Sequence, residues 1–358
     1  MPSKVYFLPW ERRSELYEFL KAARIFSHVK ARQFLAVKMH FGEEGNEGYI
    51  KPEYIPPLVK IAREKTAFPF LTDASTIYVG QRSDAYHHLL IANKHGFNIE
   101  SCGCPVVIAD GLRGNADKEV EINLKHVKKA AVARDIYYAD SFIFLNHFKG
   151  HEVTGFGGAL KNMGMGCGSK AGKYEMHNTS KPRVRAEKCT ACGTCVKWCK
   201  QNALSLEPYG EKKNGKQPKR IVMDKTKCAG CGQCIVNCAF GVFSVNWNED
   251  AGFVQEKIVE YAAAVIKNKK AGYVNFLNHI SKNCDCFGFA KNPPMMQDIG
   301  ILAGNDPVAI DQASYDLVNK AYGKNFCKHM HPDIKPEIQL EYAQKIGMGS
   351  REYELINY

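Results

Sequence analysis

Short apolar runs along the chain stop repeatedly at polar residues and are followed by polar or glycine-rich loops. The runs FLAVKM, FPFLT, PVVIA and SFIFLN stop at His40, Asp73, Asp110 and His147. Between them lie three helix-like stretches: YIPPLVKIAREKTA, SDAYHHLLIANKHG and DKEVEINLKHVKKAAVARD. This alternation predicts an α/β fold with a mostly parallel sheet covered by helices. Ligands of such sheets bind beyond the carboxyl ends of the strands, so we expect these four residues to converge on one rim.

The same pattern resumes towards the end of the chain. EKIVEYAAAVIKNKK predicts a helix, AGYVNFLNHI and DIGILAG predict strands, and NDPVAIDQASYDLVNKAYG predicts a helix with Asp306 as its N-cap and Pro307 at its first position. The tetrapeptide FLNH ends a predicted strand twice, at 144–147 and at 276–279, either by chance or because both strands feed one cleft. We predict an α/β domain built from residues 1–185 and 247–358, interrupted by a small inserted α+β domain at residues 186–246.

The inserted segment contains eight of the 14 cysteines, in two copies of the spacing C-x2-C-x2-C-x3-C. This is the spacing with which bacterial ferredoxins bind two 4Fe-4S clusters, where the fourth cysteine of each copy binds the other cluster. The predicted ligands are Cys189, Cys192, Cys195 and Cys238 for the first cluster, and Cys228, Cys231, Cys234 and Cys199 for the second. A pair of zinc ribbons is disfavoured, since each would use two C-x2-C pairs. Cluster spacing rather than disulfide pairing indicates a reducing compartment, and we expect the cytoplasm.

The net charge of +12 is concentrated near these cysteines, with thirteen basic and four acidic residues between positions 181 and 227. No base-stacking aromatics alternate with the basic residues and no nucleic-acid module is recognisable, so a nucleic-acid partner is not expected. A docking surface for an acidic redox protein, such as a ferredoxin or flavodoxin, and a merely solvated basic face both fit. No apolar run is long enough for a membrane span, and charges interrupt the first twenty residues, against a secretory signal.

Residues 147–173, HFKGHEVTGFGGALKNMGMGCGSKAGK, contain eight glycines, four lysines and two histidines. The spacing fits neither a P-loop nor a dinucleotide fingerprint. We interpret the segment as a loop whose backbone N–H groups bind a small anion, with Lys161, Lys170 and Lys173 adding charge and His147 and His151 carrying protons. The alternative is a glycine-rich packing loop with solvated lysines.

A second cysteine group, Cys284 and Cys286, stands apart from the cluster motifs. Two cysteines one residue apart could bind an additional metal ion together with Cys167 or a histidine such as His279, or act as a redox-active thiol. The alternative is that both are small buried hydrophobic residues. The predicted catalytic residues are His147, His151, Lys161, Cys284 and Cys286.

The motifs MHFGEEGNEGYIKP, ADGLRG, NCDC and DIGILAGNDPVAIDQAS, together with the glycine-rich segment, resemble the family called domain of unknown function 362. The resemblance implies an iron–sulfur protein whose α/β domain has no assigned reaction. The stretch from His151 to Lys161 also resembles a loop of the lactate racemase family, in which the histidine is a proton or hydride relay and the lysine anchors a nickel-pincer nucleotide. This similarity implies that His151 and Lys161 face one ligand.

The leading hypothesis is an iron–sulfur oxidoreductase in which electrons cross two 4Fe-4S clusters to a small, anionic substrate or cofactor in the α/β cleft. One alternative is a cofactor-modifying or racemase-like enzyme with regulatory clusters. Another is a non-catalytic electron-transfer protein whose α/β part only docks partners.

Overall fold

The computed structural model describes residues 2–78, 80–177, 181–199, 201–212, 217–228, 233–244, 250–286 and 292–358. The strands are β1 (Ser3–Pro9), β2 (Phe34–Lys38), β3 (Phe68–Asp73), β4 (Val106–Ile108), β5 (Asp117–Glu121), β6 (Lys129–Ala133), β7 (Ser141–His147), β8 (Lys149–His151), β9 (Gly155–Gly157), β10 (Arg183–Val184), β11 (Leu204–Pro208), β12 (Lys219–Met223), β13 (Phe243–Ser244), β14 (Ala271–Leu277), β15 (Gly300–Gly304) and β16 (Tyr353–Asn357). The α-helices are α1 (Leu16–Ala22), α2 (Ile55–Glu64), α3 (Ala85–Lys94), α4 (Ile99–Cys102), α5 (Arg134–Tyr138), α6 (Ala159–Cys167), α7 (Lys170–His177), α8 (Thr194–Lys197), α9 (Gln233–Asn237), α10 (Ala251–Val265), α11 (Pro307–Tyr322), α12 (Phe326–Met330) and α13 (Ile338–Lys345). Short 3-10 helices span Trp10–Glu15, Pro52–Tyr54 and Ala186–Lys188.

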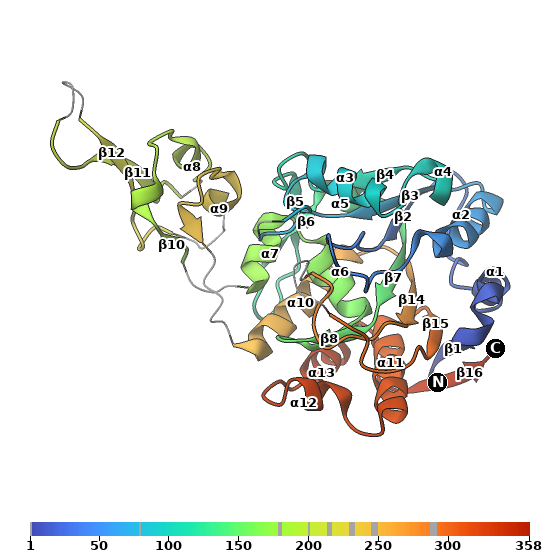
Figure 1. Cartoon of the computed structure of the whole chain (residues 1–358). Helices are drawn as coiled ribbons and strands as arrows, with labels where there is room; N and C mark the ends of the chain where they lie inside the picture. The colour runs from blue at the N-terminus through green and yellow to red at the C-terminus, as the bar shows by residue number, and fades with distance from the viewer. Residues whose placement is uncertain are drawn as a thin grey trace.

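A mixed sheet of eight strands forms the centre of the described chain, in the order β16-β1-β15-β14-β7-β2-β3-β4 (Figure 1). The strands from β14 to β4 run parallel to one another, and β15 runs antiparallel to its neighbours β14 and β1. The predicted α/β class and mostly parallel sheet are therefore confirmed. No described helix is long and apolar enough to cross a membrane.

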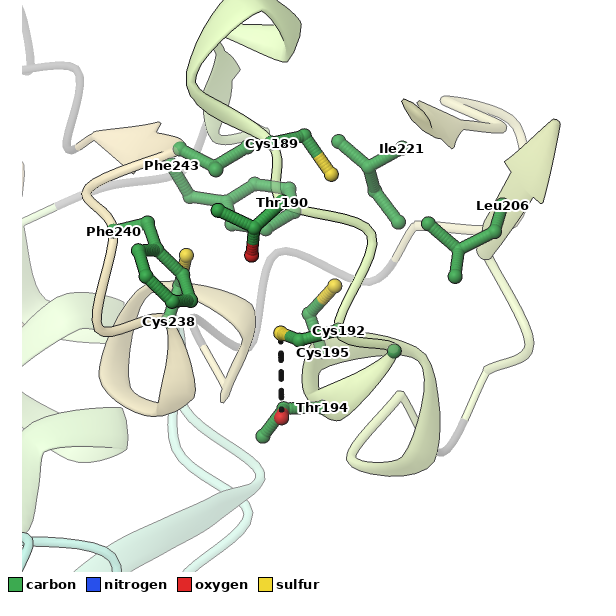
Figure 2. A pocket seen from close by; sticks show the side chains of 12 residues that line it. Cys189, Thr190, Cys192, Thr194, Cys195, Leu206, Ile221, Cys238, Phe240 and Phe243 are labelled. Atoms are coloured by element: carbon green, nitrogen blue, oxygen red, sulfur yellow. Dashed lines mark hydrogen bonds between the residues drawn. The ribbon is translucent and has the colours of Figure 1, made fainter. Parts of the chain in front are cut away.

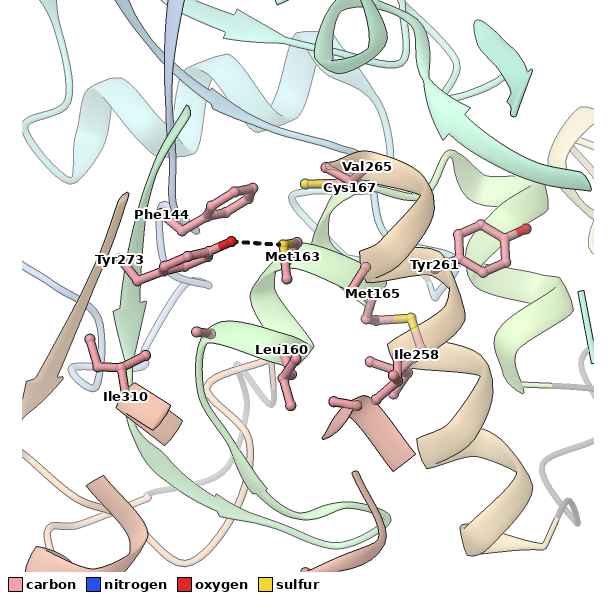
Figure 3. Close-up of a cluster of buried hydrophobic side chains, with 14 of the residues drawn as sticks. Phe144, Leu160, Met163, Met165, Cys167, Ile258, Tyr261, Val265, Tyr273 and Ile310 are labelled. Carbon is pink, nitrogen blue, oxygen red and sulfur yellow. Dashed lines mark hydrogen bonds between the residues drawn. The ribbon is translucent and has the colours of Figure 1, made fainter. Parts of the chain in front are cut away.

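Strand β7 shows how the two hydrophobic clusters divide between the faces of the sheet. All of its residues are buried, as expected for a parallel strand covered on both sides. Phe142 and Phe144 belong to the cluster that includes residues of α6, α10, α11 and α13, whereas Ile143 and Leu145 belong to the cluster that includes α1 and α2. Figure 3 shows the first cluster, where α6 and α10 pack together beside the sheet.

Residues 117–135, predicted to be helical, instead form the antiparallel pair β5 and β6. That prediction was wrong because the segment has an alternating pattern and a turn, both typical of paired strands. Burial alternates within β6, where Ala130 and Val132 are buried and Lys129 is exposed. Asn123, with a positive φ of 52°, helps the chain to turn between the strands.

The glycine-rich segment is also different from the predicted loop, because nearly half of it is helical and two short strands precede the helices. After β8 and β9 it forms α6 and begins α7. Asp311 in α11 caps α6 by accepting hydrogen bonds from the backbone N–H groups of Ala159 (2.7 Å) and Leu160 (2.9 Å). A Cβ atom at Gly164 would lie 2.0 Å from the carbonyl oxygen of Ile258, so glycine there permits close packing of α6 on α10. The glycines thus serve helix packing in addition to turns.

The cysteine-rich segment has a small hydrophobic cluster of its own, which includes Leu204, Ile221, Val242 and Phe243. Strands β10 and β13 pair where the chain enters and leaves this segment, and β11 pairs antiparallel with β12 within it. Figure 1 shows the segment beside the large sheet. The boundaries at residues 186 and 246 remain a prediction.

Candidate functional site

The segment Asn283–Cys286 follows β14 and presents its side chains to two groups of residues. Cys284 contacts Lys161, from the first turn of α6. Asp285 contacts His147, at the end of β7, and His40, two residues beyond β2. The structure thus brings predicted site residues together at the carboxyl ends of the parallel strands, the expected position for a ligand site.

The first group is a thiolate paired with an ammonium. Lys161 Nζ donates a hydrogen bond to Cys284 Sγ at 3.1 Å. A hydrogen bond from the Cys286 thiol, the charge of Lys161 and a hydrogen bond from His151 together outweigh burial and hold the pKa of Cys284 well below its usual range. The bond to Cys284, together with burial, raises the pKa of Cys286 well above its usual range. These shifts favour the thiolate form of Cys284 and the thiol form of Cys286.

The hydrogen bonds of His151 determine which of its ring nitrogens carries the proton in the neutral form. Its Nδ1 accepts hydrogen bonds from the backbone N–H groups of Val153 (3.1 Å) and Thr154 (3.2 Å), so the neutral ring carries its proton on Nε2. His151 is 4% exposed, whereas Lys161 and Cys286 are partly exposed. A ligand could therefore reach the group past Lys161 and Cys286, while His151 offers a proton from within.

Lys161 is positioned by residues remote in sequence. Asp311, which caps α6, also accepts a hydrogen bond from Asn275 Nδ2 in β14 at 2.8 Å. A Cβ atom at Gly158 would lie 2.3 Å from Asp311 Oδ1, so only glycine lets the backbone approach the carboxylate there. Burial raises the pKa of Asp311 to about 6. These contacts fix the first turn of α6, and with it the direction of Lys161.

The second group surrounds Asp285, which is 2% exposed. One carboxylate oxygen, Oδ2, lies 2.7 Å from His147 Nδ1, 2.9 Å from His40 Nε2 and 3.0 Å from Lys149 Nζ. Burial by itself would raise the pKa of Asp285, but His147, Lys149 and His40 outweigh it and hold the pKa well below its usual range. Burial lowers the pKa of His40 to about 4, so its imidazole is neutral at pH 7.

The other predicted rim residues have different partners. Asp73 forms a buried ion pair with Lys38 Nζ at 2.9 Å, and Arg82 Nη1 lies 3.6 Å from its other oxygen. Asp110 accepts hydrogen bonds from the backbone N–H (3.0 Å) and hydroxyl (2.9 Å) of Ser75. Of the four rim residues, His40 and His147 are thus joined through Asp285, whereas Asp73 and Asp110 belong to separate polar contacts.

In the cysteine-rich segment, the four cysteines predicted for the first cluster line one cavity. Its walls are completed by apolar side chains, among them Leu206, Ile221 and Phe243 (Figure 2). Backbone N–H groups donate to two of the predicted ligand sulfurs, from Ala191 to Cys189 (3.3 Å) and from Ala203 to Cys199 (3.2 Å). Thiolates from the required residues, N–H···S bonds and an apolar wall are compatible with an iron–sulfur cluster.

The cysteines predicted for the second cluster are described in part. Cys199, Cys228 and Cys234 are partly buried, and Cys231 lies outside the described residues. Cys234 belongs to α9, which contacts α7 of the α/β part. A hydrogen bond of 3.3 Å from Asn115 Nδ2 to Asn237 Oδ1 adds to this contact.

Helix α7 also reaches the thiolate group. Its last residue, His177, has its pKa lowered to about 3 by burial and by the neighbouring His151 and Lys161, while the charge of Cys284 acts in the opposite direction. One helix thus connects the cysteine-bearing α9 with the surroundings of Cys284.

The comparison with protein families identifies the chain. Residues 35–316 match the family described as Domain of unknown function (DUF362). The chain belongs to the DUF362 family. No curated protein matches it.

Two solved structures resemble this DUF362 chain at 11% sequence identity. A protein from Thermotoga maritima matches with a TM-score of 0.43, over 87% of this chain and 59% of its own. The lactate racemase apoprotein from Thermoanaerobacterium thermosaccharolyticum matches with a TM-score of 0.39, over 76% of this chain and 50% of its own. This chain therefore spans little more than half the length of either structure. At such low similarity neither carries an argument about the chemistry of the DUF362 site.

The DUF362 match includes both groups of site residues, and it spans residues 186–246 without identifying a ferredoxin-like unit there. Sequence reasoning named His147, His151, Lys161, Cys284 and Cys286 as catalytic candidates, and their roles remain predictions. The structure adds to these groups the partners Asp285, Lys149 and His177. Asp285 stands between the two cysteines in the sequence, and this position beside two candidate ligands could have indicated its role.

Two expected ligands lie elsewhere. Cys167 is fully buried in the hydrophobic cluster beside α10, and burial raises its pKa to about 12. It behaves as a small hydrophobic residue. His279 makes its described contacts with Asp298, through its backbone N–H, and with the carbonyl oxygen of Asn292.

Proposed function

We propose that this protein is an iron–sulfur oxidoreductase. Single electrons pass through two 4Fe-4S clusters to a small, anionic substrate or cofactor bound beside Cys284, His151 and Lys161. The observation that carries the proposal is the Cys284–Lys161 pair, which lies at a strand-end site and is connected by α7 to a helix that bears a predicted cluster ligand.

The residues of the thiolate group have distinct roles in this function. Lys161 is partly exposed and donates a hydrogen bond to a single described acceptor, Cys284, so its ammonium can also bind an anionic group. His151 supplies protons from Nε2 as electrons arrive, and His147 is the second candidate proton donor. The Cys284 thiolate interacts with the reacting centre as a nucleophile or as a metal ligand.

The electron donor would be an acidic redox protein such as a ferredoxin or flavodoxin. The basic side chains near the predicted clusters that could receive it are exposed, among them Lys188, Lys197, Arg220 and Lys227. Trp198, next to the predicted ligand Cys199, is 46% exposed and adds an apolar contact. An electrostatic encounter of this kind weakens as ionic strength rises, because salt screens exposed charges.

The function can be tested on anaerobically purified protein. We expect about eight iron and eight sulfide per chain. After photochemical reduction, a panel of small anionic electron acceptors is added and reoxidation of the clusters is followed by visible absorption and low-temperature EPR. Wild type should be reoxidised by one acceptor class at a saturable rate. Lys161→Met and the double variant Cys284→Ser, Cys286→Ser should retain their iron and lose that saturable reaction.

If metal analysis finds no iron, the proposed path of electrons through two clusters is contradicted. Full iron with equal reoxidation of wild type and both variants would place the terminal site elsewhere and would favour a plain electron carrier. As a control, Lys94→Met removes an exposed lysine of α3 that pairs with Glu44, and should leave reoxidation unchanged.

A further inference from the structure

A second site lies on the other side of the Asn283–Cys286 segment, and its chemistry is independent of the proposed electron transfer. The ligand-type atoms of His40, His147 and Asp285 all lie within 4.8 Å of one another. We propose that these three residues bind a divalent transition-metal ion.

The hydrogen bonds of His147 favour a metal ion between the three side chains. Its Nε2 lies 2.7 Å from the carbonyl oxygen of Asn278, an acceptor, so Nε2 carries a proton. Its Nδ1 faces a second acceptor, the carboxylate of Asp285, at 2.7 Å. A neutral imidazole can donate to one of these only, so without a metal ion both contacts require a doubly protonated imidazolium. A metal ion at Nδ1 satisfies both nitrogens, and a ring N–H that donates to a backbone carbonyl is the usual outer support of a metal-binding histidine.

Asp285 supplies the second, independent observation. Its Oδ1 atom is buried and has no hydrogen-bond partner among the described residues, although the side chain is 2% exposed and charged. Three donors instead crowd Oδ2. An unpartnered buried carboxylate oxygen is costly, and coordination of a cation removes that cost. Gly48 lies directly against it, since a Cβ atom there would be 2.8 Å from Oδ1.

His40 completes the set through Nε2. In the structure Nδ1 accepts a 3.2 Å hydrogen bond from the backbone N–H of Gly42, so the Nε2 proton points to Asp285. Metal binding at Nε2 moves that proton to Nδ1, which then gives up the hydrogen bond from Gly42.

Lys149 competes with the metal ion. Its ammonium lies 3.0 Å from Asp285 Oδ2 and also donates to the carbonyl oxygen of His147 at 2.8 Å. When a metal ion binds, Lys149 can retain the second of these bonds and release the first. Removal of this positive charge should therefore strengthen metal binding, which is the opposite of what is expected if Lys149 and Asp285 form a purely structural ion pair.

Two imidazole nitrogens and one carboxylate suit zinc or ferrous iron better than magnesium or calcium, which prefer oxygen ligands alone. Three protein ligands leave at least one position for water or a substrate group, the pattern of catalytic rather than structural sites. The thiolate of the neighbouring Cys284 is directed to Lys161, so the two sites have different ligand types.

The experiment uses the cluster-containing protein under anaerobic conditions, with zinc as the probe. Zinc binding is measured by equilibrium dialysis and the ligands by X-ray absorption at the zinc edge. We expect one zinc per chain with nitrogen and oxygen neighbours at about 2.0–2.2 Å and no sulfur at about 2.3 Å. A change to a residue that only supports a metal ligand typically weakens metal binding roughly 10–100-fold. His40→Gln and Asp285→Asn remove ligands themselves, so each should weaken zinc binding at least as much. Lys149→Met should tighten it about tenfold or more, because a like charge is removed.

Two control variants separate this site from others. The Cys284→Ser, Cys286→Ser double variant should retain the zinc, and His87→Gln, which changes an exposed histidine of α3, should bind as wild type does. Sulfur neighbours would place the zinc on cysteines, whether at Cys284 or at cluster positions without iron. That result, absence of zinc, or weaker binding in Lys149→Met would overturn the proposal. None of these outcomes depends on whether the thiolate group receives electrons.

Discussion

The charge state of Cys284 depends on Lys161, and the change Lys161→Met removes that dependence while keeping an unbranched side chain. Two unit charges 3.1 Å apart interact by about 5 kcal/mol at an effective dielectric constant of about 20. That energy corresponds to nearly 4 pKa units. Hydrogen bonds from Cys286 and His151 remain in the variant, so we expect only part of this shift. The pKa of Cys284 should therefore rise, by less than this amount.

The assay is alkylation with iodoacetamide, followed at each cysteine by mass spectrometry between pH 6 and pH 10. The thiolate is the reacting form. At pH 7 a smaller fraction of Cys284 is thiolate in Lys161→Met, so this variant should be alkylated at Cys284 more slowly than wild type, by up to about tenfold for each unit by which the pKa rises. The two rates should converge near pH 10.

Cys167 serves as the reference within each sample. It is buried like Cys284, but burial raises its pKa to about 12, so it should react slowly in both proteins. Lys173→Met, which removes a buried lysine that contacts Gly168, should leave the Cys284 rate unchanged. Equal Cys284 rates at pH 7 in wild type and Lys161→Met would refute the reasoning, because the thiolate would then not depend on the ammonium.

Three further predictions concern iron binding and stability. Cys238→Ser should remove about four iron per chain, measured by metal analysis, if this residue binds the first cluster; retention of about eight would contradict that ligand set. The pKa of Asp311 is about 6 in the folded chain and about 3.9 in the unfolded chain. The folded state therefore binds the proton more tightly. The free energy of unfolding should fall by up to about 3 kcal/mol as the pH rises from 4 to 6 and this proton is lost. Urea denaturation should show this slope in wild type and not in Asp311→Asn; equal slopes would argue against it. Gly164→Ala should lower the free energy of unfolding by about 3 kcal/mol or more, because its Cβ atom would meet the Ile258 carbonyl. As a control, Gly347→Ala, where a Cβ atom meets open space and φ is 79°, should lower it by about 1 kcal/mol. Similar losses for the two variants in thermal denaturation would refute the packing argument.

The sequence predicted the sheet well because its parallel strands are buried on both faces. Runs such as SFIFLNH and AGYVNFL have no polar face to obscure them, and β7 and β14 match them closely. The N-cap of α11 was also predictable, since Asp306 accepts hydrogen bonds from the N–H groups of Val308 and Ala309. Local signals of this kind are complete within a few residues.

The failures arose where the deciding partner lies far away in the chain. Residues 159–167 contain two glycines and were interpreted as a loop, but Asp311 caps the helix from about 150 residues away. In residues 117–135 the apolar residues fit both the alternating spacing of a strand and the spacing of a helix. The segment forms strands because β5 pairs with β6. For the site, the residue types at positions 151, 161 and 284 indicated chemistry, yet only the fold shows that Lys161 donates to Cys284 rather than to a carboxylate.

The short pairing of β10 with β13 has a consequence for a protein exposed to oxygen. The two ends of the cysteine-rich segment are held side by side by this pairing, and β7 and β14 are neighbours in the sheet although the segment lies between them in the chain. The large sheet therefore does not depend on the interior of the inserted segment. If the proposed clusters were lost to oxygen, the sheet, with Cys284 and Asp285, would keep its own strand pairing. Such damage would be repairable, because new clusters could be inserted into a chain that is still largely folded.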